Sequence, residues 1–172
     1  MTASKSFMYF SAIVAIQGAH IVEHIIQLIQ VYVLGVPEDD ALGLLGYVFE
    51  FQGTEEWLHL VFNLTFLLTL YALVPIIKGN TPSPVPTSAF LVFLAAAVGL
   101  ETWHVVEHGV IISNVLANNG CPCPGIVDAA TGLTDTILHF FYNAVAYIGV
   151  AVPYWYVYQA RRAGRALTLR MA

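Results

Sequence analysis

The chain has 172 residues, of which 58% are hydrophobic and only 10% are charged, and its mean hydropathy is +0.73. These values lie outside the range of soluble globular domains and within that of integral membrane proteins. The net charge of −5 gives no reason to expect a nucleic-acid partner, and we expect the lipid bilayer to surround most of the chain.

Four apolar stretches are each long enough to cross a bilayer, which requires about 20 helical residues at a rise of 1.5 Å per residue. In chain order we expect transmembrane helices over residues 7–34, 57–77, 87–116 and 136–158. The first and third stretches are longer than the minimum, so they should tilt or extend beyond the hydrocarbon region. The sequence therefore predicts an all-α integral membrane protein, a four-transmembrane-helix bundle.

The basic residues indicate how this bundle is oriented. All six lie before the first stretch, between the second and third, or in the tail: Lys5, Lys78, Arg161, Arg162, Arg165 and Arg170. Loops 35–56 and 117–135 contain no Lys or Arg, and by the positive-inside rule they face outward. We expect both termini to be cytoplasmic, in a bacterial or archaeal cytoplasmic membrane. A short interfacial helix is expected on the outer side, within residues 37–51.

Two polar strings occur twice in these apolar surroundings. Residues 20–24 read HIVEH, and residues 104–108, which lie 84 positions later, read HVVEH. The second string places a histidine four residues before an asparagine and recurs after 80 positions, first as His59 and Asn63 and then as His139 and Asn143. All six histidines of the chain belong to these strings.

This duplication predicts two tandem helix hairpins within one membrane domain, residues 1–172. The first half would span residues 7–78 and the second half residues 87–160, with a proline-rich connector, 79–86, between them. A basic cytoplasmic tail, 161–172, follows. Because both halves start on the same side of the membrane, this is a parallel repeat.

The repeated residues are spaced so that they share one face of each helix, and polar faces in a membrane turn inward. Neutral imidazoles and carboxylates are common ligands of iron, copper and zinc. We expect the metal ligands to be His20, Glu23, His24, His59, His104, Glu107, His108, Asp135 and His139. Three amides, Gln17, Asn63 and Asn143, are expected to orient these ligands by hydrogen bonds.

Two acidic residues are candidates for proton transfer. Glu101 occupies the position that matches Gln17 in the first half, so it places an ionisable group on one side only. Glu55 lies near the outer end of the second stretch. Cys121 and Cys123, in the second outward loop, allow a disulfide, a staple of the loop or a metal-capturing thiol pair.

The metal hypothesis leads to three functional readings. The first is a non-heme di-metal oxidoreductase or redox subunit with iron or copper in the outer half of the bilayer, near a lipid-soluble substrate or quinone. The second is a haem- or bacteriochlorophyll-binding subunit of a larger membrane complex, and the third is a divalent-metal transporter or receptor. Zinc is compatible with the same ligands. Histidines that only hydrogen-bond neighbouring helices are the alternative without a metal.

Overall fold

A computed structural model of the protein describes residues 3–49, 55–78, 84–118 and 124–170. The structure is 89% helix, and the described residues contain no strand. Four helical segments are long and apolar enough to cross a membrane: Lys5–Tyr32, Trp57–Lys78, Thr87–Ala117 and Asp135–Gly164. The expected all-helical fold with four candidate spans is therefore confirmed.

Three of these spans are continuous helices, and one is built from three segments. The continuous helices are α1 (Ala3–Tyr32), α3 (Glu55–Lys78) and α7 (Asp135–Arg170). The third span consists of α4 (Thr87–Val92), the π-helical segment η2 (Phe93–Gly99) and α5 (Leu100–Ala117).

The π-helical segment lies where η2 and α7 approach each other closely. A Cβ atom added at Gly149 of α7 would lie 2.5 Å from the backbone nitrogen of Ala97 in η2, so only glycine fits there. Close backbone contact of this kind is how membrane helices gain packing energy in the absence of a hydrophobic driving force between them. A local π turn changes the register of the third span on either side of the contact.

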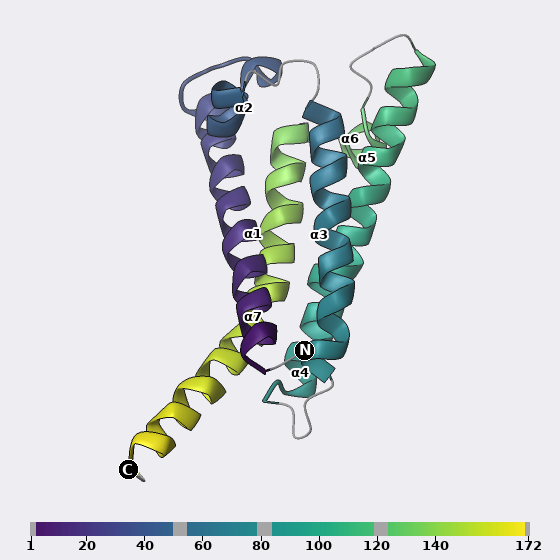
Figure 1. Ribbon diagram of the computed structural model, residues 1–172. Coiled ribbons are helices and arrows are strands. Elements are labelled where there is room, and N and C mark those ends of the chain that lie inside the picture. Colours follow the sequence, from purple (N-terminus) through teal and green to yellow (C-terminus); the bar gives the residue numbers. More distant parts are fainter. Residues whose placement is uncertain (1–2, 50–54, 79–83, 119–123, 171–172) are drawn as a thin grey trace.

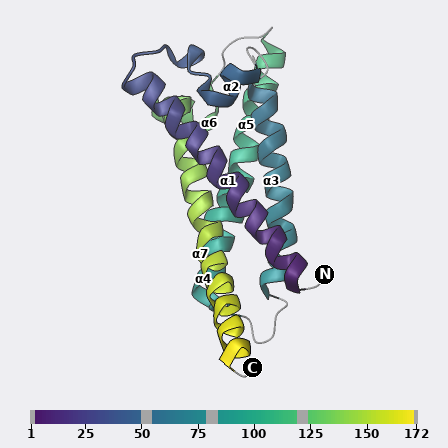
Figure 2. The same ribbon diagram turned by 60° about the vertical axis from the view of Figure 1, so that its left-hand side comes forward.

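Helix α7 packs against both α1 and the third span, mainly its η2 segment, and α3 packs against α5, each in antiparallel orientation (Figures 1 and 2). The chain begins in α1 and ends in α7 at the same end of the bundle. The short helices α2 (Gly43–Phe49) and α6 (Ile126–Thr131) lie at the opposite end, together with the 3₁₀ turn η1 (Glu38–Asp40). The short helix expected within residues 37–51 is thus present as α2.

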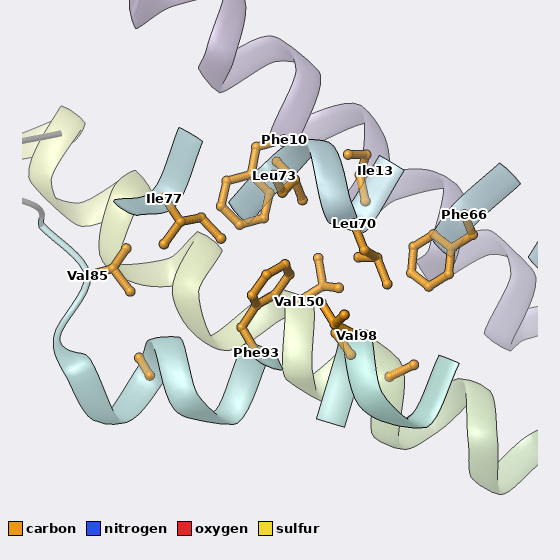
Figure 3. Close-up of a cluster of buried hydrophobic side chains, with 13 residues drawn as sticks. Phe10, Ile13, Phe66, Leu70, Leu73, Ile77, Val85, Phe93, Val98 and Val150 are labelled. Atoms are coloured by element: carbon orange, nitrogen blue, oxygen red, sulfur yellow. The ribbon is translucent and has the colours of Figure 1, made fainter. Parts of the chain in front are cut away.

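A purely apolar cluster fills the bundle near the chain termini (Figure 3). Its most deeply buried members include Leu70 and Leu73 of α3, Phe93 of η2 and Val150 of α7, each 0% exposed. Many other large apolar side chains are exposed on the outer faces of the long helices, as expected for surfaces in contact with lipid. The predicted connector, 79–86, lies mostly outside the described residues.

Candidate metal centre

The polar face of every long helix contributes to one buried cluster of imidazole rings, which we call the histidine cluster: His20, His24, His59, His104, His108 and His139. It lies between the apolar cluster and the short helices α2 and α6. His24, His104, His108 and His139 are buried, whereas His20 and His59 are partly exposed.

The ring nitrogens of this cluster face one another at short distances. His108 Nε2 lies 3.1 Å from His104 Nε2 and 2.9 Å from His139 Nε2. His104, His108 and His139 each offer a nitrogen, and these three atoms lie within 4.8 Å of one another, as a metal site requires. Two nitrogens on one tetrahedral ion, with bonds of about 2.0 to 2.1 Å, are separated by about 3.3 Å, so a small outward movement would accommodate an ion.

A second group of nitrogens lies on the side of α1. His24 Nε2 is 3.1 Å from His20 Nε2 and 3.1 Å from the amide nitrogen of Asn143. The ring of His59 lies between the two groups, since its centroid is 6.0 Å from that of His24 and 5.5 Å from that of His108. The described histidines therefore form one continuous array and not two isolated pairs.

Acceptors behind two of the rings determine which nitrogen carries the proton. His139 Nδ1 lies 2.8 Å from a carboxylate oxygen of Asp135, and His24 Nδ1 lies 2.7 Å from Gln27 Oε1. Each acceptor requires an N–H on Nδ1, which in a neutral ring leaves the lone pair on Nε2. Both lone pairs point into the cluster, as in metal sites where a second partner orients a histidine ligand. Asp135, an expected ligand, thus contacts the back of a histidine.

The expected amides connect the two halves across the bundle. Asn143 donates to the carbonyl oxygen of His139 at 2.9 Å and accepts from Gln17 Nε2 at 2.8 Å. Asn63 lies 3.5 Å from His104 Nε2. Asn143 belongs to the second half but contacts His24 of the first, and Asn63 does the reverse. Each asparagine therefore reaches across the bundle, but not to matched histidines, because His24 corresponds to His108 and His104 corresponds to His20.

The carboxylates of Glu23 and Glu107, both expected as ligands, point toward the outer short helices. Glu23 Oε1 accepts from the backbone N–H of Leu45 in α2, and Glu107 Oε1 accepts from that of Val127 in α6, each at 2.7 Å. A Cβ atom on Gly43 or on Gly125 would overlap the corresponding carboxylate. Acceptors at helix N-termini satisfy otherwise unpaired N–H groups, so these glutamates anchor α2 and α6 over the cluster.

Glu101 is completely buried beside the cluster. Its carboxylate lies 3.6 Å from His104 Nδ1, and neither of its oxygens nor that nitrogen has a hydrogen bond within the described structure. Buried carboxyl groups are nearly always hydrogen-bonded, so this unsatisfied pair is an unusual feature of the cluster. The side chain of Glu55 and the residues Cys121 and Cys123 lie outside the described parts of the structure.

A pocket of about 340 Å³ reaches the cluster from one side. Residues of α1, α3 and the α2 region line it: Ile16, Ala19, His20, Glu23, Gln27, Leu42, Leu45, Gly46, Leu58, His59 and Phe62. The two partly exposed histidines of the cluster are both in its wall. The sequence did not predict this pocket. A sign of it was present, however, because the small Ala19 stands at the position that Trp103 occupies in the second half.

The described geometry defines a helical bundle with four candidate membrane spans and a buried histidine group able to hold a metal ion. No protein-family model matches the sequence, and comparisons with curated proteins and with solved structures found no match.

Proposed function

We propose that the histidine cluster binds one or two transition-metal ions, iron or copper, and that the protein acts as a membrane oxidoreductase or as the redox subunit of a larger complex. The observation that carries this proposal is the close approach of Nε2 atoms within two groups, at 2.9–3.1 Å. One group joins α5 and α7, the other lies on α1, and acceptors stand behind His24 and His139. Neutral imidazoles in van der Waals contact, with lone pairs facing inward, are better satisfied by a shared cation than by one another.

The donor set supports iron or copper and is compatible with zinc, because imidazole nitrogen suits all three ions. The two nitrogen groups, with His59 between them, provide enough donors for two ions, each with two or three imidazoles. Asp135 and Gln27 would then hold ligand rings in place, and Glu101 would accept or deliver a proton beside His104.

We infer that the bundle arose by duplication and that both termini are cytoplasmic. This places the short helices α2 and α6 outside and the metal centre in the outer half of the bilayer. The corresponding contacts of Glu23 with α2 and of Glu107 with α6 support the duplication.

The other two readings have less support from the geometry. A haem or bacteriochlorophyll bound between facing histidines requires a gap between their rings that is wide enough for the macrocycle. The ring centroids are only 4.8 Å apart for His104 and His108 and 4.7 Å apart for His108 and His139. A metal-transport path would have to cross the apolar cluster shown in Figure 3, where the described side chains offer no ligand.

Metal analysis of the purified protein tests the proposal. The protein would be extracted in detergent, and its metal content and absorbance spectrum recorded. We expect about two equivalents of iron or copper, as in other dinuclear helical bundles. His108→Ala and His139→Ala should lose most of this metal, whereas Ser113→Ala, on the exposed face of α5, should retain it. Size-exclusion chromatography and circular dichroism would verify that each variant is folded. A folded protein with no tightly bound metal, or with equal metal in all variants, would overturn the proposal.

A further inference from the structure

The pocket beside the histidine cluster lies between two membrane-spanning helices. Ile16 of α1 and Leu58 of α3 form part of its wall and are 56% and 43% exposed on the outside of the bundle. Helix α2 covers the pocket, held there by bonds from Leu45 to Glu23 and from Gly43 to Gln30. A molecule can therefore reach His20 and His59 from the lipid without crossing the bundle.

At the corresponding place in the second half, a large side chain occupies the position of Ala19. Trp103 corresponds to Ala19, and its indole N–H donates to the hydroxyl of Tyr142 at 3.3 Å. The neighbouring His104 is 0% exposed. His20, the corresponding histidine, keeps part of its surface accessible beside Ala19.

The lining of the pocket defines the chemistry of its ligand. Most of the wall is aliphatic, so the body of the ligand must be apolar. The ring of Phe62 stacks on His20 at 4.1 Å with an interplanar angle of 26°, which provides flat surfaces next to the cluster. His59 adds an imidazole, able to donate to or accept from an oxygen on a ring. The volume of about 340 Å³ suits one ring system, with any tail left in the lipid.

We propose that this pocket binds a lipid-soluble molecule whose planar ring carries carbonyl or hydroxyl oxygens, the class of quinones, quinols and related phenols. The ligand contacts His20 and His59 with its polar edge and the aliphatic wall with its body. This assignment rests on the proposed function, because the ligand would contact imidazoles of the proposed metal centre. The small Ala19, where the second half has Trp103, gives the ligand access to His20 in the first half.

The test is a binding titration with the protein in phosphatidylcholine nanodiscs, using a benzoquinone with a ten-carbon tail. Decylbenzene, which has the same tail and a ring without oxygens, serves as the control probe. We expect saturable binding of one quinone per chain. Ala19→Trp, which copies the second half, should weaken binding by at least about tenfold, a change of about 1.4 kcal/mol. Val22→Trp is the matched variant, because Val22 lies on the same helix, is 54% exposed and is outside the pocket.

The outcomes separate this inference from the proposed function, because metal content is measured on the same samples. Normal metal content without saturable quinone binding overturns the pocket assignment alone. So does equal binding by Ala19→Trp and Val22→Trp, or equal binding of decylbenzene, which would indicate an acyl-chain groove. Saturable quinone binding that Ala19→Trp removes, in a protein that binds no metal, would support the pocket and overturn the metal centre.

Discussion

The contact between Glu107 and the N-terminal turn of α6 allows a sharp test of what the repeated glutamates do. Gly125 has φ −71° and ψ −174°, an extended conformation that any residue can adopt. Substitution by alanine there creates no backbone strain. The added Cβ would, however, overlap Glu107 Oε1, which accepts from the N–H of Val127 at 2.7 Å. Gly125→Ala must therefore displace the carboxylate and break this hydrogen bond.

The expected cost follows from the bond that is lost. A hydrogen bond to a charged acceptor contributes about 1.5 to 3 kcal/mol, so Gly125→Ala and Glu107→Ala should each destabilise the protein by roughly that amount. In the double variant the alanine at position 125 meets no carboxylate and adds almost no further cost. The double-mutant cycle should therefore give a coupling energy of about 1.5 to 3 kcal/mol between the two sites.

Unfolding in mixed micelles with increasing dodecyl sulfate, followed by circular dichroism, measures these free energies. The HVVEH string also suggested that Glu107 is a metal ligand. Metal content, recorded on the same variants, tests that role. We expect Glu107→Ala to retain its metal, because the described geometry directs its carboxylate to α6 and away from the histidine nitrogens. Additive costs in the cycle, or loss of metal in parallel with His108→Ala, would refute this reasoning.

Four further outcomes are expected. Asp135→Asn removes the charged acceptor behind the His139 ring, so metal affinity should fall by about 10- to 100-fold with the fold intact. Competition with a chelator would measure this affinity, and an unchanged affinity would contradict the role of Asp135. Gly149→Ala should destabilise the bundle by about 1 to 3 kcal/mol, because its Cβ would meet the backbone of η2. Gly109→Ala, whose Cβ meets nothing within 4 Å, should not. Equal unfolding free energies of the two variants would argue against the close contact. Acidification should release the metal, since protons compete for imidazole nitrogen, and metal retained at low pH in a dialysis series would exclude an all-imidazole site. Trp103→Ala should create a second pocket and raise quinone stoichiometry from one toward two, and a stoichiometry that stays at one would show that this side chain does not close the second half.

The fold could be predicted to the level of four membrane helices, since uninterrupted apolar stretches about 20 residues long have few alternatives. The packing of α1 against α7 and of α3 against α5, across the two expected hairpins, could not be predicted, because it depends on contacts between distant residues. Gly149 illustrates this limit. The need for glycine at this position becomes clear only when the backbone of Ala97 is seen to lie against it. The π turn in η2 produces no recognisable hydropathy pattern.

The histidines could be predicted as one group because costly polar residues recurred at the same spacing. The roles of the acidic residues could not be predicted from spacing alone. Glu23 and His24 are adjacent in sequence, but successive residues of a helix point about 100° apart, and the carboxylate reaches α2 while the imidazole turns inward. Gly43 and Gly125, each at the start of a short outer helix, were the available sign that a side chain approaches closely there.

The departures from symmetry are more informative about function than the repeat itself. Two matched halves would suffice to assemble a cluster of imidazoles and to hold α2 and α6 over it. A second requirement is needed to explain why Trp103, hydrogen-bonded to Tyr142, stands in one half where the small Ala19 lines a pocket in the other. Glu101 stands where the first half has Gln17; it lies beside His104 and is not part of the pocket wall. Under the proposed function, reduction of a quinone in the pocket takes up protons as well as electrons. The ionisable side chains of the pocket wall, His20, Glu23 and His59, are then its nearest proton donors, whereas Glu101 acts beside His104.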